Sequence, residues 1–466
     1  MLQNRMLHSS GSVPDHQDAY LPNHRANDRS HRAIWTAGWC RIHGWSARHD
    51  ADGWLLWHIQ PVYVLIRLAA TGYSEATQMA TDASRCFLTP TQAMLLTGFT
   101  IAHYLLDKGY LSSESILDGR FTAHLASSRN TNYLINRDAN KGSLFVKQVQ
   151  AWDQEKIETL RTEATCYWLA ENEAEYAQLR KFLPPYLAFD SQNHILITEA
   201  VQGAISLNDF YLQQRSFPLQ LATRQAELLG SFHKTIARSV QDAPSFRLFR
   251  KQEPVVFLWS SSGFPAYSGH QSQAERQMVQ LITKNEDYMT RLSAVREKWE
   301  ATSLIHGDIK PANFLINQDA PSTGHYDLRL IDWETADIGD PCWDVAAIFQ
   351  SYLFYWIYHE PLQGQSAQNS YASYGFSLET MQPSMRQFWQ TYIRLMDWTA
   401  EEAEANLSKI VGYCALKLIH TCYETIQQAS TMPLHSARLL QLSLNMLRSP
   451  DEAIWSVLGI PNAVRL

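Results

Sequence analysis

The sequence predicts an α+β protein in which a small β-rich lobe with one helix precedes a larger, mostly helical lobe. Between residues 121 and 201, four apolar strand-like runs surround one helical segment at about 154–173. After Gly203 the apolar residues recur mostly at helical spacing. Two regions interrupt this helical part, a strand–loop–strand at 304–316 and a short strand at 326–333.

The four runs of the small lobe are FTAHLASS, NTNYLIN, GSLFVKQ and HILITEAV, and each has the length and the β-branched or aromatic content of a strand. We therefore assign 119–202 to the first lobe and 203–466 to the second. Residues 79–118 are expected to form a helical lead-in. Its helix would begin at Thr89-Pro90, a cap followed by proline, and would end near Gly109.

Residues 1–78 differ from the rest of the chain. They place five tryptophans among histidines and arginines in IWTAGWCRIHGWSARHDADGWLLWH, without a sustained helical or strand period. Two interpretations remain open, a poorly structured tail or an extension that precedes a functional chain starting near Met79.

The bulk composition describes a globular protein of two or three folding units. The chain has 466 residues, of which 45% are hydrophobic and 18% are charged, and its formal net charge of -7 argues against nonspecific binding of nucleic acid. The six scattered cysteines form no CxxC pair, which is typical of a reducing compartment. The most apolar early stretch, residues 53–70, contains histidine, proline and arginine, so no membrane span is expected and the cytoplasm is the expected location.

The loop inside LIHGDIKPANFLI places Asp308, Lys310 and Asn313 between two apolar strands that would hold it rigidly. Asp332 ends another apolar strand. Oxygen ligands from two loops, Asn313 and Asp332, suit Mg²⁺, an ion that nucleotide phosphates usually complete. A carboxylate at Asp308 could accept a proton from an attacking hydroxyl.

Lys147 lies inside the strand-like run SLFVKQ. A buried lysine costs free energy unless an acidic group accompanies it, so a partner is expected. Glu163 on the single helix of the small lobe is the candidate.

Taken together, these residues resemble the protein-kinase-like superfamily, specifically its aminoglycoside phosphotransferase and choline kinase branch. HGDIKPANFLI is similar to the catalytic loop of that family, LIDWE to its metal motif, and GDPCWDVA to the segment that follows. The resemblance covers about residue 116 to the C-terminus. It implies a two-lobed protein-kinase-like fold, the cofactors ATP and Mg²⁺, and a cleft between the lobes for the nucleotide.

The resemblance also implies a role for each matching residue. On the nucleotide side, Lys147 would contact the α- and β-phosphates, Glu163 would hold Lys147, and the Glu199 carbonyl and Val201 amide would meet the adenine edge. In the second lobe the roles are a catalytic base (Asp308), a cation on the transferring phosphate (Lys310), magnesium ligands (Asn313, Asp332) and support of the catalytic loop (His306, Asp344).

Three features depart from the pattern of regulated protein kinases. Gly307 stands where those enzymes have arginine, and the segment from Asp332 to Asp344 is too short for a long activation segment. The expected glycine-rich nucleotide loop is replaced by residues 127–130, where Arg129 could contact phosphate.

The sequence leaves the phosphate acceptor open. The first hypothesis is an ATP-dependent phosphotransferase acting on a hydroxyl of a small molecule, such as an amino alcohol, a sugar or an antibiotic. The second is a Ser/Thr-peptide kinase in a ribosomal peptide natural-product pathway, because the segment from Tyr104 to Gln148 resembles that of such phosphotransferases. The third is a pseudokinase that binds nucleotide without catalysis. Nucleotide preference and oligomeric state are open as well.

Overall fold

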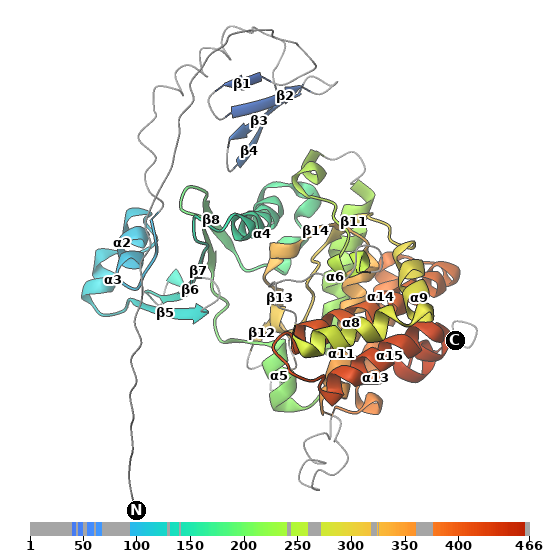
Figure 1. The fold of residues 1–466 in the computed structure, drawn as a ribbon. Helices are drawn as coiled ribbons and strands as arrows, with labels where there is room; N and C mark the ends of the chain where they lie inside the picture. Colours follow the sequence, from blue (N-terminus) through green and yellow to red (C-terminus); the bar gives the residue numbers. More distant parts are fainter. Residues whose placement is uncertain are drawn as a thin grey trace, which may run out of the picture. The chain divides into compact units, whose positions relative to one another are not determined.

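The computed structural model describes residues 94–461 except 128–130, 139–140, 240–243, 260–271, 318–323, 325 and 360–375, together with four strands between residues 40 and 67. The chain divides into two compact units, residues 1–80 and 81–466 (Figure 1). The expected helix start at Thr89-Pro90 and the candidate phosphate contact Arg129 lie outside the described residues.

The first unit contains a four-stranded antiparallel sheet with the strand order β1-β2-β3-β4. Its strands are β1 (Cys40–Ile42), β2 (Trp45–His49), β3 (Trp54–Ile59) and β4 (Val62–Arg67). The sequence predicted no regular element here. The aromatic and β-branched residues of β3 and β4, such as Trp57 opposite Val64, favour paired strands even without strict alternation. The domain boundary at residue 79 stays a prediction.

The small lobe of the second unit is built on a five-stranded antiparallel sheet with the order β5-β6-β7-β9-β8. Its strands are β5 (Thr122–Ser127), β6 (Thr131–Asn136), β7 (Leu144–Gln148), β8 (Tyr186–Asp190) and β9 (Ile195–Glu199). Four of them match the expected runs. The fifth, β8, was not expected, because two prolines precede it and its residues are all half-buried instead of alternating.

One helix covers each face of this sheet (Figure 1). Helix α2 (Thr100–Asp107) buries Ile101 and Leu105 against Val146 and its neighbours. Helix α4 (Gln154–Asn172) lies on the other face, where Leu196 joins its core cluster. Because side chains alternate along a strand, Lys147 points to the face opposite Val146, which is the face of α4.

The lead-in before the sheet is helical only in part. Helix α2 begins at Thr100, after a turn in which the Thr97 hydroxyl accepts a hydrogen bond from the Thr100 amide at 3.2 Å. Leu95 and Phe99, which were expected on the helix, therefore precede it. The helix ends before Gly109, whose φ of +76° suits glycine, and a short helix α3 (Ser113–Leu117) follows.

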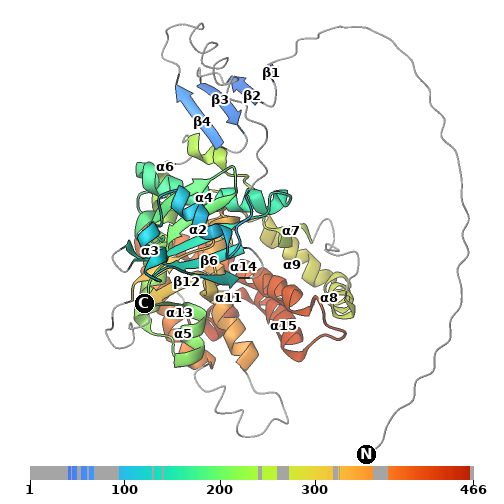
Figure 2. The same cartoon turned by 90° about the vertical axis from the view of Figure 1, so that its left-hand side faces the viewer.

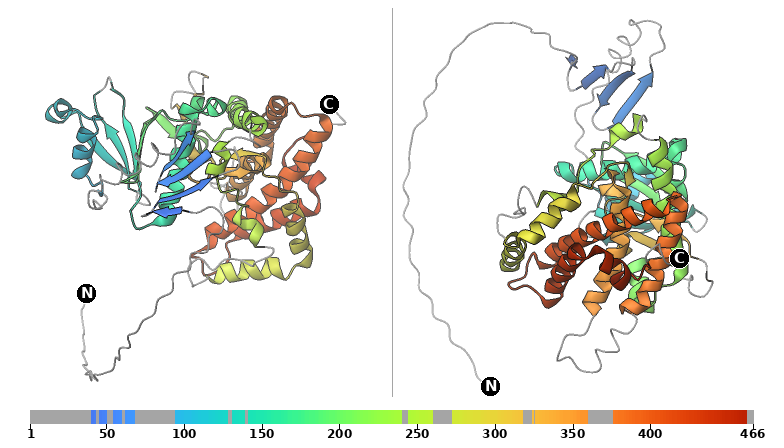
Figure 3. Two further views of the ribbon diagram at one scale, coloured as in Figure 1. Left: turned by 90° about the horizontal axis from the view of Figure 1, so that it is seen from above. Right: turned by 90° about the vertical axis from the view of Figure 1, so that its right-hand side faces the viewer.

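The second lobe is mostly helical (Figures 2 and 3). Its buried apolar side chains belong to one large hydrophobic core. Its helices are α5 (Leu207–Gln214), α6 (Leu219–Ser239), α7 (Val255–Leu258), α8 (Gln273–Thr283), α9 (Glu286–Arg296), α11 (Pro341–His359), α13 (Leu378–Met396), α14 (Ala400–Ile426), α15 (Leu434–Arg448) and α16 (Pro450–Glu452). Helix α6 packs on α13, and α14 packs on α11 and α15. The α+β architecture that the sequence predicts is thus confirmed.

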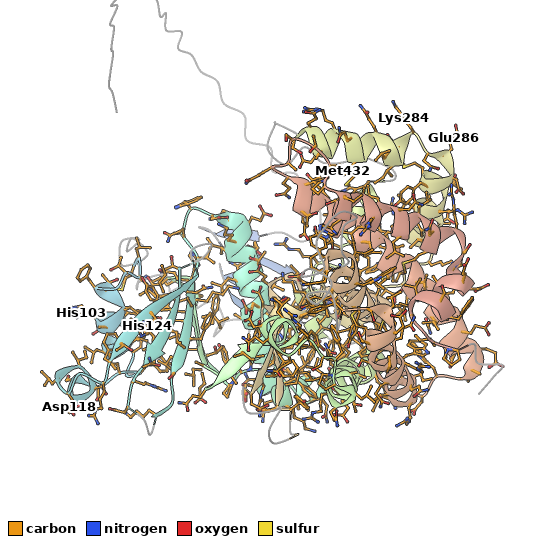
Figure 4. All side chains as sticks on the ribbon, turned by 90° about the horizontal axis from the view of Figure 1, so that it is seen from below. His103, Asp118, His124, Lys284, Glu286 and Met432 are labelled. Atoms are coloured by element: carbon orange, nitrogen blue, oxygen red, sulfur yellow. The ribbon has the colours of Figure 1, made fainter. Side chains whose placement is uncertain are left out.

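Five short strands hold the loops between these helices. Strands β10 (Ala204–Ser206), β12 (Phe314–Asn317) and β13 (Leu328–Leu330) form one antiparallel sheet, and β11 (Ser303–Ile305) pairs with β14 (Asp337–Gly339). No helix in the described part of the chain is long and apolar enough to span a membrane. Figure 4 labels His103 and His124 in the small lobe, and Lys284 and Met432 at the far side of the helical lobe.

Candidate active site

The loop that carries Asp308 is fixed at both ends by strand pairs. Strand β11 enters it and pairs with β14, and β12 leaves it and pairs with β13. Within the loop, Ile309 is buried, and residues Pro311–Asn313 form one 3₁₀ turn. The polar side chains of this loop are therefore presented from a rigid base, as the sequence predicted.

Asp344, in the first turn of α11, holds the beginning of the loop. Its buried carboxylate accepts hydrogen bonds from the His306 amide at 2.7 Å and the Gly307 amide at 3.0 Å. Burial opposes its ionisation, but hydrogen bonds from the His233 ring and the His306 amide hold the pKa of Asp344 below its usual value. A buried carboxylate that accepts hydrogen bonds from two backbone amides fixes their positions.

The His306 ring forms two hydrogen bonds that hold the same loop. Its Nδ1 accepts from the Asp308 amide at 3.3 Å, and its Nε2 donates to the Ile331 carbonyl at 3.0 Å. These two bonds require the neutral tautomer with the proton on Nε2. Burial lowers the pKa of His306, which favours the same neutral form.

Gly307 is required by both conformation and space. Its φ is +82°, and a Cβ at this position would lie 2.7 Å from the Thr335 carbonyl oxygen. The Thr335 hydroxyl also donates to the His306 carbonyl at 2.9 Å, so the two loops are tied together here. The arginine found in regulated protein kinases could not occupy this position without moving the segment around Thr335.

We expect Gly307→Ala to lower the free energy of unfolding by roughly 1–3 kcal/mol, because a strained φ is combined with a backbone clash. Gly119→Ala is the matched control, since its φ is +68° but no atom lies within 4 Å of the added Cβ. Urea unfolding of both variants measures the difference. Equal losses of unfolding free energy in the two variants would mean that the added Cβ avoids the Thr335 carbonyl oxygen at no cost in stability.

The three polar side chains of the loop are bonded to one another. Lys310 Nζ lies 2.5 Å from Asp308 Oδ2, and both side chains are nearly half exposed. The Asn313 amide nitrogen donates to the Asp308 carbonyl at 2.9 Å and to Asp308 Oδ2 at 3.3 Å. Since the nitrogen of Asn313 is used in this way, its amide oxygen remains as a ligand atom.

Lys147 joins the small lobe to the second polar segment. Its ammonium lies 2.7 Å from Glu163, 2.8 Å from Asp332 and 3.1 Å from Glu334. Burial opposes the charge of Lys147, yet the three carboxylates raise its pKa and keep it protonated. The expected Lys147–Glu163 ion pair is present, and Asp332 and Glu334 extend it across the two lobes.

Asp332 adopts a left-handed backbone conformation with φ of +67° at the end of β13. This turn directs its side chain to Lys147, whose positive charge outweighs burial and lowers the pKa of Asp332. One carboxylate oxygen each from Glu163, Asp332 and Glu334 lies within 4.8 Å of the others. These hard oxygen donors, together with the Asn313 amide oxygen, are the ligand types that Mg²⁺ prefers.

The family of the chain follows from a comparison with protein-family models. Residues 121–384 match the model of the phosphotransferase enzyme family, which is more than half of the 466 residues. The chain belongs to this family. It is a phosphotransferase, a kinase whose acceptor is an alcohol group, and it has the two-lobed kinase-like fold.

Three solved structures resemble this phosphotransferase in fold. An ethanolamine kinase from Plasmodium vivax is 13% identical and has a TM-score of 0.43, with 84% of this chain and 97% of that chain covered. A choline kinase from Cryptosporidium parvum is 14% identical with a TM-score of 0.45, covering 78% and 98%. Spectinomycin phosphotransferase, in complex with ADP and spectinomycin, is 12% identical with a TM-score of 0.33, covering 71% and 92%. Among curated proteins, no sequence matches this chain.

The segment expected to meet adenine connects the two lobes of the phosphotransferase. Strand β9 ends at Glu199, and Val201 follows two residues later, before β10. The Ala200 amide donates to the Ser143 carbonyl at 2.9 Å, which fixes the segment to the sheet. The contacts of Glu199 and Val201 with a base stay a prediction.

Sequence reasoning missed Glu334 and Trp343. Glu334 follows Asp332 by two residues within LIDWE, so the motif itself carried the signal. The Trp343 indole donates to the Gly307 carbonyl at 3.3 Å, a contact that no sequence spacing indicates.

Proposed function

We propose that this phosphotransferase transfers the γ-phosphate of ATP to a hydroxyl of a small molecule such as an amino alcohol, a sugar or an antibiotic-like compound. One observation carries the proposal. Lys147 and Glu163 from the small lobe meet Asp332 and Glu334 from the helical lobe, so the cation expected at the nucleotide phosphates stands beside the oxygen ligands expected at magnesium.

In this proposal Asp332 and Asn313 hold Mg²⁺, and Glu334 is a further ligand. Their oxygen atoms fit this ion by chemistry. Bound Mg²⁺ would neutralise charge on the phosphates. Lys147 contacts the α- and β-phosphates, and Glu163 keeps Lys147 in place.

Asp308 acts as the general base in the proposal. Its half-exposed carboxylate can orient the acceptor hydroxyl and take its proton. Lys310 is bonded to this carboxylate, and it is exposed enough to turn toward the transferring phosphate and stabilise its charge.

The short segment after Asp332 favours a small acceptor over a peptide. Strand β14 begins at Asp337 and α11 at Pro341, so the chain runs directly into the helix. This connection leaves no long segment on which an extended peptide could be laid.

The test is nucleotide titration with and without Mg²⁺. We expect ATP to bind tightly only with Mg²⁺, and Asp332→Asn to weaken that binding, because a charged ligand is lost. Asparagine tolerates the left-handed conformation of residue 332, so the backbone change is small. Calorimetry measures the affinities of the wild type and the variant.

Asp327→Asn is the control for this titration. Asp327 lies at the surface, where it pairs with Arg329, and its loss is expected to leave nucleotide affinity unchanged. If the wild type showed no Mg²⁺-dependent binding of ATP, the proposed function would be wrong.

A further inference from the structure

One face of helix α14 lies opposite the candidate catalytic loop. Lys417, His420 and Glu424 are three and four residues apart, a spacing that places them on one side of a helix. The charge of Asp308 acts on both Lys417 and His420, and the charge of Glu424 acts on Lys310. Because Trp343 contacts both Lys417 and Gly307, this face borders the position where an acceptor would meet Asp308.

Trp343 connects Lys417 to the loop. The Lys417 ammonium lies 3.9 Å from the centre of the Trp343 ring, and the indole of that ring donates to the Gly307 carbonyl. The His420 ring lies near another aromatic ring, with its centre 5.9 Å from that of Trp259. Two aromatic rings, those of Trp343 and Trp259, thus lie beside the face of α14 that carries Lys417 and His420.

Lys417 forms no direct ion pair among the residues that the structure describes. Lys147 is paired with three carboxylates, Lys310 with Asp308, and Lys409 of the same helix with Asp340 at 2.9 Å. Lys417 makes only the ring contact, and burial lowers its pKa to about 8. The carboxylates of Asp344, Asp308 and Glu424 oppose this shift, but none of them pairs with Lys417 and burial outweighs them, so a bound anion would lower the free-energy cost of the buried cation.

We propose that Lys417 binds an acidic group of the acceptor, so that the substrate is an alcohol that also carries a carboxylate. The inference rests on the proposed function, because it takes Asp308 as the group that receives the hydroxyl. A carboxylate fits better than a phosphate. A single ammonium balances one negative charge, and the neighbouring Asp308 and Glu424 would repel a second.

The acceptor preference is tested with defined probes on the full chain in the presence of Mg²⁺-ADP. D-glycerate and L-homoserine represent hydroxylated carboxylates, glycerol 3-phosphate an alcohol with a phosphate, and ethanolamine and choline cationic alcohols. We expect calorimetry to detect binding of a carboxylate probe, with weaker or no binding of the phosphate and the cations. Phosphorylation of the same probes by Mg²⁺-ATP provides a second measurement.

Substitutions of Lys417 test whether this residue causes the preference for a carboxylate. In Lys417→Met the unbranched stem can still pack on Trp343 while the charge is lost, so the carboxylate Kd is expected to rise roughly ten- to a hundredfold, the size of a lost charged hydrogen bond. Lys417→Arg is expected to restore part of the affinity. Lys284→Met, on the surface after α8, serves as the control and is expected to bind like the wild type.

Three results would overturn the inference while the proposed function stands. They are the absence of carboxylate binding, tighter binding of ethanolamine, choline or glycerol 3-phosphate, and unchanged carboxylate affinity in Lys417→Met, each with normal binding of Mg²⁺-ATP. Loss of Mg²⁺-ATP binding in the wild type would instead remove the proposed function. Should Lys417→Met fail to fold, as thermal unfolding would reveal, Lys417→Gln takes its place.

Discussion

Asp308→Asn is expected to reduce turnover by roughly 10²–10⁴-fold while the affinity for Mg²⁺-ATP stays near that of the wild type. Asparagine keeps the size of the side chain and its oxygen near Lys310, so the loop should retain its shape. The substitution removes the group that can accept the proton of the acceptor. Single-turnover phosphorylation of an acceptor, beside a nucleotide titration, measures both quantities.

Two further variants distinguish a loss of catalysis in Asp308→Asn from a change in the structure of the loop. Lys310→Ala should mainly reduce turnover, since a charge on the transferring phosphate is largest in the transition state. Asp451→Asn, at an exposed position in α16, should leave turnover and affinity unchanged. Full activity in Asp308→Asn would end its assignment as the base. Parallel loss of ATP affinity in Asp308→Asn and Lys310→Ala would mean that the loop is only structural.

Lys147→Met is expected to lower the free energy of unfolding by about 3–5 kcal/mol, the cost of breaking a buried ion pair on one side. The side chains of Lys147 and Glu163 are only 7% and 6% exposed, so solvent cannot replace the lost partner. Asp332 and Glu334 would also lose their shared cation. Urea unfolding at neutral pH measures the change.

A double variant tests whether the loss comes from the uncompensated charge. In Lys147→Met/Glu163→Leu both buried charges are replaced by apolar groups, so a large part of the stability should return. Nucleotide binding should stay weak in the double variant, because the cation is still absent. A loss below about 1 kcal/mol in Lys147→Met would show that the pair contributes no more than an exposed ion pair does.

The sequence determined the β-rich and helical lobes and the chemistry of the loops. Four of the five strands of the main sheet follow from their apolar and β-branched runs. The polar residues of HGDIKPAN and LIDWE can be recognised from their spacing within a short stretch. The position of Lys147 inside a strand likewise predicts an acidic partner. One sequence is enough to recognise such patterns, because they depend on neighbours a few residues away.

The sequence failed where a local signal was weak. Strand β8 is held mainly by pairing with β9, and the strands between residues 40 and 67 pair with one another without clear alternation. Helix α2 begins at Thr100, so Leu95 and Phe99, which the sequence placed on a helix, precede it.

Only the tertiary structure decided which groups meet across the lobes. It placed Glu334 beside Lys147, brought the Trp343 indole within hydrogen-bond distance of the Gly307 carbonyl, and placed the Lys417 ammonium of α14 over the Trp343 ring. These contacts join residues dozens to hundreds of positions apart. They depend on how α4, α11 and α14 pack, and packing follows from the shapes of whole buried surfaces, which no short pattern in the sequence records.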